Sequence, residues 1–134
     1  MAALALVAMI TLAGCTSSGS KSAPGAPSSE SGVPPKVMVG IAAAEKACMN
    51  LGDALTKQRN GAPAADVATA MTAAAAASRA AAEQDLRWSG FANDIGAIAN
   101  GEATQAGTTR VGGVCAHLSQ DASIYTSTAP YPAG

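Results

Sequence analysis

The sequence predicts an all-α fold: an up-down four-helix bundle with one disulfide, preceded by a disordered linker. Three observations support this prediction. Alanine, the best helix former, supplies much of the 49% hydrophobic content of the 134 residues, in runs such as AAAAAS and RAAAE. Apolar residues recur at spacings of three and four in four segments between residues 37 and 122. Two widely spaced cysteines fall on apolar faces of the first and last of these segments.

The first two predicted helices form a pair joined by a short connection. The first begins at Val37 and ends before Asn60-Gly61, a helix stop signal. Its apolar stripe consists of Val37, Ile41, Ala44, Cys48, Leu51 and Leu55. Pro63 is favourable in the first turn of the second helix. Asp66 lies near the N-terminal end of this helix, where the positive end of the helix dipole favours an acidic side chain. This helix runs to about Gln84, with Val67, Met71, Ala74, Ser78 and Ala81 on one face.

The third and fourth predicted helices are shorter. Asp85 is placed to cap the third, and Asn100-Gly101 closes it. Its apolar residues are Trp88, Phe91, Ile95 and Ile98. Thr104 is placed to cap the fourth, whose shared face holds Val111, Val114, Cys115 and Leu118. Three glycines, Gly107, Gly112 and Gly113, weaken this helix, because each costs about 1 kcal/mol relative to alanine.

Short connections make neighbouring helices antiparallel, so the first and fourth helices are expected to be adjacent. Cys48 and Cys115 lie on their apolar faces, and a small domain with a thin core commonly needs a covalent link. We therefore predict a Cys48–Cys115 disulfide, which contributes about 4 kcal/mol in the chain-entropy model. Two alternatives stay open: separate buried thiols, and a zinc site that also enlists His117.

The N-terminal segment is predicted to be a signal peptide, residues 1–14. Residues 2–13 are uncharged and apolar apart from Thr11, but a bilayer-spanning helix needs about 20 such residues. Twelve is the length of a signal-peptide core. The segment ends in Leu12-Ala13-Gly14-Cys15, which resembles the lipobox of bacterial lipoproteins. The alternatives are a plain secretory signal and a buried helix with a chance cysteine.

The lipobox resemblance implies that Cys15 is the lipidation site and becomes the mature N-terminus. In that family the thiol takes a diacylglycerol and the new amino group is often acylated, for instance with palmitate. The expected location is the outer face of the cell membrane, with the lipid on Cys15 as the membrane contact. Residues 15–36 are then the anchor and linker: fifteen of residues 16–35 are Ser, Gly, Pro or Thr, too polar a composition to form a core.

Catalytic and cofactor chemistry finds little support in the sequence. The formal net charge of −1 gives no basic field for nucleic acid. His117, the single histidine, lies one turn from Asp121, which favours a local ion pair or a solvated face over a catalytic arrangement. Gly112-Gly113 lacks the lysine and glycine pattern of a phosphate loop. We expect no enzyme activity, no cofactor and no metal.

The alanine-rich helices, the distant cysteines and the sequence DLRW (residues 85–88) also resemble small exported helical proteins of high-GC Gram-positive bacteria. The resemblance covers residues 42–120 and implies an actinobacterial type of source. The layout is similar to small lipoproteins carried by phages of those bacteria, some of which block superinfection. For a phage-borne chain, the resemblance implies superinfection exclusion.

Two functions are compatible with the sequence. The helical domain, residues 37–122, is either a non-catalytic interaction module for an envelope protein or a carrier of a small apolar ligand or lipid. A carrier requires an internal cavity lined by Trp88, Phe91 and Met71, although aromatic residues at helical spacing are more often core. The tail, residues 123–134, is expected to be extended, with Tyr131 exposed as a partner contact or as part of a frayed terminus.

Overall fold

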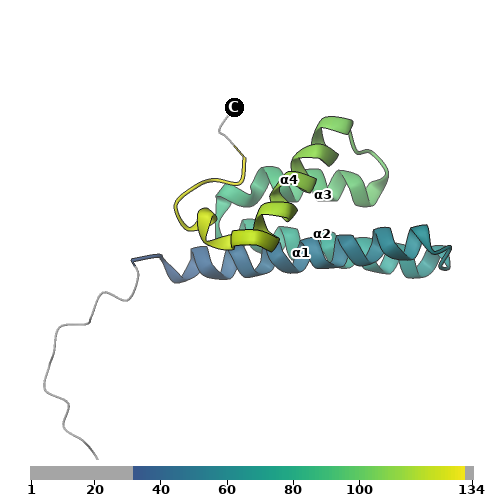
Figure 1. The fold of residues 1–134 in the computed structure, drawn as a ribbon, viewed down its shortest axis with the longest axis horizontal. Helices are drawn as coiled ribbons and strands as arrows, with labels where there is room; N and C mark the ends of the chain where they lie inside the picture. The colour runs from purple at the N-terminus through teal and green to yellow at the C-terminus, as the bar shows by residue number, and fades with distance from the viewer. Residues whose placement is uncertain (1–31, 132–134) are drawn as a thin grey trace, which may run out of the picture. The chain divides into compact units, whose positions relative to one another are not determined.

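The computed structural model describes residues 32–131, and within this span it is helical without a strand (Figure 1). The four α-helices are α1 (Pro35–Arg59), α2 (Ala64–Gln84), α3 (Ser89–Asn100) and α4 (Gln105–Asp121). Two short 3-10 helices, η1 (Leu86–Trp88) and η2 (Ala122–Thr126), precede α3 and follow α4. The all-α prediction is therefore confirmed. The predictions for the signal segment, Cys15 and the linker up to residue 31 lie outside the described residues.

Helices α1 and α2 form a long antiparallel hairpin (Figure 1). Its interface is built mainly from alanine. Ala44, Ala47 and Ala54 of α1 and Ala74 and Ala81 of α2 are completely buried. Methyl groups let two helix backbones approach closely. The alanine runs that favour helix in the sequence therefore also supply the packing surface.

Helices α3 and α4 form a second, shorter hairpin that packs on the first, and the chain runs up-down-up-down as predicted (Figure 1). The predicted stops of the first and third helices and the predicted cap of the fourth are confirmed. Gly61 and Gly101 adopt left-handed φ values of 69° and 74° after α1 and α3, a conformation that glycine reaches without a Cβ penalty. The Thr104 hydroxyl accepts a hydrogen bond from the Gly107 backbone N–H (3.0 Å), which caps α4.

An aromatic cluster forms the centre of the core. Trp88 contacts Phe91 and Tyr125 edge-to-face, with ring centroids 5.5 and 5.2 Å apart, and all three side chains are buried. Gly40 of α1 lies against the indole, and a Cβ at this position would approach two indole ring atoms to 3.4 Å. Glycine at position 40 therefore lets α1 pack closely on Trp88.

The structure differs from the predictions in three places. Leu55 ends the predicted apolar stripe of the first helix but is 42% exposed, because α4 crosses α1 nearer to Cys48. Asp85 caps η1 rather than α3, accepting a hydrogen bond from the Arg87 N–H. The tail is not extended from residue 123: η2 continues to Thr126 because Tyr125 packs into the core.

Candidate functional site

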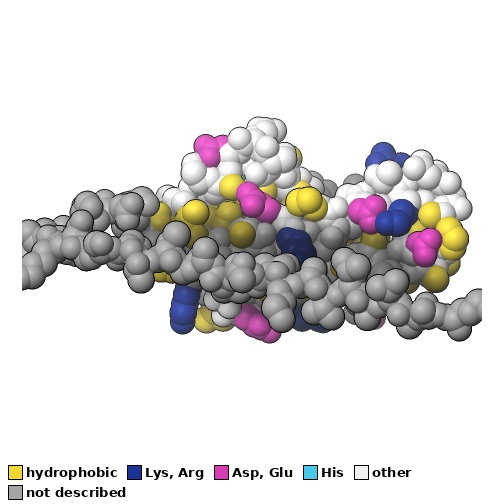
Figure 2. Space-filling model, turned by 90° about the horizontal axis from the view of Figure 1, so that it is seen from below, with side chains coloured by type: hydrophobic (Ala, Val, Ile, Leu, Met, Phe, Trp, Pro, Cys, Tyr) yellow, Lys and Arg dark blue, Asp and Glu magenta, His cyan; other side chains and the backbone are white. Residues whose placement is uncertain are grey.

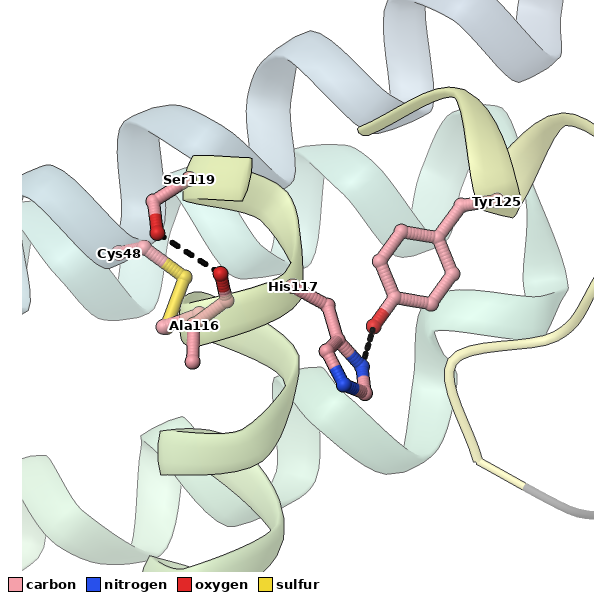
Figure 3. Close-up of a disulfide and its surroundings, with 6 residues drawn as sticks. Cys48, Ala116, His117, Ser119 and Tyr125 are labelled. Atoms are coloured by element: carbon pink, nitrogen blue, oxygen red, sulfur yellow. Dashed lines mark hydrogen bonds between the residues drawn. A yellow bond between two sulfur atoms is a disulfide. The ribbon is translucent and has the colours of Figure 1, made fainter. Parts of the chain in front are cut away.

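A disulfide joins α1 to α4, as predicted. Cys48 and Cys115 have sulfur atoms 1.98 Å apart and Cα atoms 5.5 Å apart (Figure 3). Contact between α1 and α4 is otherwise sparse, because Val111, Val114 and Leu118 of α4 pack into the shared core. The disulfide therefore ties together two helices that leave open space on either side of it.

The largest opening beside the disulfide is an apolar hollow of about 240 Å³. Its lining comes from α1, α3 and α4: Cys48, Leu51, Gly52, Leu55, Ile98, Thr108, Val111, Gly112 and Cys115. The Thr108 hydroxyl donates to the Thr104 carbonyl oxygen (3.0 Å), so this polar group is already satisfied within α4. The hollow consequently offers a surface for apolar ligand atoms.

Two further hollows lie along α1. The second, about 230 Å³, lies on the other side of the disulfide and is lined by Glu45, Cys48, Met49, Cys115, Leu118 and Ser119. The third, about 210 Å³, is lined by Met38, Ile41, Ala42, Glu45, Ala122, Ser123 and Thr126. We call these three hollows together the α1–α4 groove. Its α1 side runs from Met38 to Leu55, about 25 Å at 1.5 Å per residue.

The α1–α4 groove carries little charge. Glu45 is the only ionisable side chain among the described residues that line the three hollows. The Ser119 and Thr126 hydroxyls donate to the carbonyl oxygens of Ala116 and Ser123, both at 2.7 Å (Figure 3 shows the first). Met38, Met49 and Leu55 are 51%, 74% and 42% exposed, so they form an apolar rim.

Two helix-interior glycines contribute to the lining of the largest hollow. Gly52 lies in α1 and Gly112 in α4, and a Cβ built at either position meets no atom within 4 Å. Packing within the described chain therefore does not require glycine at these positions. In a chain this rich in alanine, the two glycines leave space that alanine would occupy.

A second cluster of polar side chains ties the C-terminal tail to α3 and α4. Asp94 accepts two hydrogen bonds from Arg110, both at 3.0 Å, and a third from the Tyr131 hydroxyl at 2.8 Å. The Arg110 guanidinium lies 5.3 Å from the centre of the Tyr131 ring. Burial and the hydrogen bond to Asp94 raise the pKa of Tyr131 well above its usual range.

The position of Tyr131 corrects its sequence-based prediction. The ring was expected to be exposed, but it is partly buried against the core and meets the backbone of Gly90. The sequence does not predict this cluster, because Asp94 and Arg110 are sixteen residues apart on different helices. No local spacing signals such a pair.

His117 lies on the exposed side of α4, two residues after Cys115. Its Nδ1 is 3.4 Å from the Tyr125 hydroxyl oxygen, and the imidazole is otherwise exposed (Figure 3). Burial raises the pKa of Tyr125. Asp121 does not pair with His117 in this structure: its carboxylate accepts hydrogen bonds from the N–H and hydroxyl of Ser123, which lower the pKa of Asp121.

The residues predicted to line a ligand cavity lie elsewhere. Trp88 and Phe91 are 1% and 0% exposed, and Met71 packs at the edge of the core. None of these side chains lines the α1–α4 groove. The aromatic pair therefore has the core role that its helical spacing favoured in the sequence. The rim residues Met38 and Met49 were missed, because they lie beside the predicted apolar stripe of α1.

Within residues 32–131, no cluster of three or more His, Cys, Asp or Glu side chains is arranged to hold a metal ion. In the same span, no helix has both the length and the hydrophobicity needed to cross a membrane. Acidic and basic side chains are intermixed on the face seen in Figure 2, in keeping with the formal net charge of −1. A search with the chain finds no matching protein family, curated protein or solved structure.

Proposed function

We propose that this chain is a membrane-anchored lipoprotein whose helical domain is a non-catalytic binding module at the outer face of the cell membrane. Cys15 carries the lipid, residues 1–14 are removed, and the linker spaces the domain from its anchor. The Leu12-Ala13-Gly14-Cys15 sequence is the basis for lipidation.

The observation that carries the proposal is the Cys48–Cys115 disulfide. Structural disulfides persist in oxidising compartments and are rare in a reducing cytoplasm. A chain with three cysteines, two joined in the folded domain and the third at the end of an apolar segment, matches export followed by anchoring. The α1–α4 groove supplies an apolar surface for binding.

The carrier function remains the second candidate, and one observation moves it to a different site. The aromatic core cannot provide the ligand cavity, since Trp88 and Phe91 are fully packed. The α1–α4 groove provides open apolar space instead. A carrier would bind its ligand there, beside the disulfide.

Phase partition tests the anchor. In a bacterial host that processes lipoproteins, the wild-type chain should enter the detergent phase and show the mass of a lipidated Cys15 peptide. Cys15→Ala should stay uncut and unlipidated, and any cleaved product should be soluble. Cys115→Ala is the matched control, because it removes a cysteine without touching the lipobox. Equal partition of wild type and Cys15→Ala would refute lipidation, since firm retention needs two or more acyl chains.

A pull-down tests the binding module. The lipidated chain is recovered from its own membrane, and co-purifying proteins are identified by mass spectrometry. An interaction module should retain a defined envelope protein, and Met49→Glu at the groove rim should release it. Recovery of the same proteins with Met49→Glu would show that the rim is not the binding surface.

A further inference from the structure

We infer that the largest hollow beside the disulfide is a binding site for a compact, uncharged hydrophobic molecule such as a substituted benzene. This inference rests on the carrier candidate of the proposed function and deepens it, because it names the class of ligand. It concerns one hollow only, and every residue that it uses lies in the described helices.

The two walls of this hollow have the same register. Each wall supplies four residues at positions i, i+3, i+4 and i+7, the set that forms a hole for one inserted side chain when helices pack. The two sets are Cys48, Leu51, Gly52 and Leu55 of α1, and Thr108, Val111, Gly112 and Cys115 of α4. Glycine occupies position i+4 in both sets, and a Cβ there would meet no atom within 4 Å. The hollow is therefore a pair of facing holes that no side chain of the described residues fills.

The hollow has a buried floor and an open mouth. Leu51 and Val111 are 7% and 1% exposed, and the partly buried Ile98 of α3 adds to the apolar lining. Leu55, which also lines the hollow, is 42% exposed. A ligand can therefore enter from the solvent and contact buried side chains.

The charge of the lining selects an uncharged ligand. None of the described residues that line the largest hollow is ionisable, whereas Glu45 lines each of the other two hollows of the α1–α4 groove. The Thr108 hydroxyl donates to the Thr104 carbonyl oxygen at 3.0 Å, so its proton is not needed by a ligand. A carboxylate or ammonium group placed in this lining would lose its hydration without gaining a counter-charge.

The volume of the hollow selects a compact ligand. An apolar cavity of about 150 Å³ in another protein binds benzene, and pockets for drug-sized ligands begin at about 300 Å³. The hollow, about 240 Å³, lies between these values and fits one ring with a short substituent. A long acyl chain would exceed this volume, and the hollow on the other side of the disulfide is lined by Glu45.

The disulfide fixes the distance between the two walls. Cys48 and Cys115 belong to opposite walls, and their Cα atoms are 5.5 Å apart. From this point α4 leads away from α1 towards its own N-terminus (Figure 1). Because the walls are covalently joined, a ligand need not order them, which keeps the conformational cost of binding low.

Photolabelling tests the inference on the full chain, purified with its disulfide intact. The probe is phenyl(trifluoromethyl)diazirine, which is uncharged, and its matched anionic analogue carries a para-carboxylate. After irradiation and digestion, mass spectrometry should place the neutral label on peptides containing Cys48–Leu55 and Thr108–Cys115. Excess toluene should remove this label. The carboxylate analogue should label the same peptides at least about tenfold less, because its charge must be desolvated.

Two variants locate the label in the hollow. The Gly52→Leu, Gly112→Leu double variant fills the hollow with side chains and should reduce labelling about tenfold, since the ligand loses its apolar contacts. Gly113→Leu is the matched control, because Gly113 also has open space but does not line the hollow, and it should keep the label. Trp88 fluorescence verifies that both variants fold. If the double variant does not fold, competition by toluene in the wild type decides the question.

The outcomes separate this inference from the proposed function. Absence of label from the two peptides, or equal labelling of the folded double variant, would overturn the inference. Equal labelling by the carboxylate analogue would overturn the uncharged class. Competition by palmitate without competition by toluene would keep the carrier function but assign it a lipid, which also overturns the inference. If neither competitor removes the label, the carrier candidate fails as well. The anchor and the interaction module are tested independently by Cys15→Ala and by the pull-down.

Discussion

Removal of the Cys48–Cys115 disulfide should destabilise the domain by about 4 kcal/mol. The bond closes a loop across a sequence separation of 67 residues, and the chain-entropy model gives about 4.4 kcal/mol for a loop of that length at 25 °C. Domains of this size are typically stable by about 5–15 kcal/mol, so the loss is a large part of the total.

The measurement is urea unfolding followed by the fluorescence of Trp88, the single tryptophan, which is buried in the native state. Cys48→Ala, Cys115→Ala and the double variant should lose similar amounts, because each breaks the same bond. The slope of unfolding free energy against urea should rise, since the unlinked chain exposes more surface when it unfolds. A loss below about 1 kcal/mol in all three variants would contradict the entropic reasoning.

The same variants should unfold locally in a defined order. Contact between α1 and α4 is sparse apart from the disulfide, whereas α1 and α2 pack along a long interface. Hydrogen exchange should therefore quicken most in α4 and η2 and least in the α1–α2 hairpin. Uniform acceleration over all four helices would show that the disulfide does not specifically hold α4.

Three further predictions concern the tail and the core. Gly90→Ala should cost about 1–3 kcal/mol, because its Cβ would lie 2.6 Å from the Tyr131 ring, whereas Gly96→Ala, with open space, should stabilise by about 0.4–1 kcal/mol; urea midpoints measure both. Since the pKa of Tyr131 is raised in the folded state, its stabilising contribution is complete below the ordinary tyrosine pKa of 10.0 and falls as the pH rises above it, so the unfolding free energy of wild type should decline more steeply above pH 10 than that of Tyr131→Phe. Identical slopes would show that the hydrogen bond to Asp94 does not couple to folding. Trp88→Ala should cost about 3–5 kcal/mol in thermal or urea unfolding, because it empties the centre of the aromatic cluster; a loss near that of a surface substitution would refute the core assignment.

The amino-acid sequence by itself determined the helices and their order. Asn60-Gly61, Thr104 and Gly101 end or begin helices through local backbone chemistry that involves a few neighbouring residues. The disulfide was also predictable, because helical periodicity places Cys48 and Cys115 on apolar faces and short connections make their helices neighbours. The disulfide at the centre of the candidate site could therefore be predicted from the sequence, whereas the hollows beside it could not.

Only the tertiary structure decided the groove and the tail. Periodicity shows which face of a helix is apolar, but not the place where a second helix crosses it. Because α4 meets α1 at Cys48, Leu55 is left at an open rim instead of in the core. Likewise, Tyr131 donates a hydrogen bond to Asp94 and lies beneath the Arg110 guanidinium only because distant segments pack together. No local sequence pattern predicts these contacts.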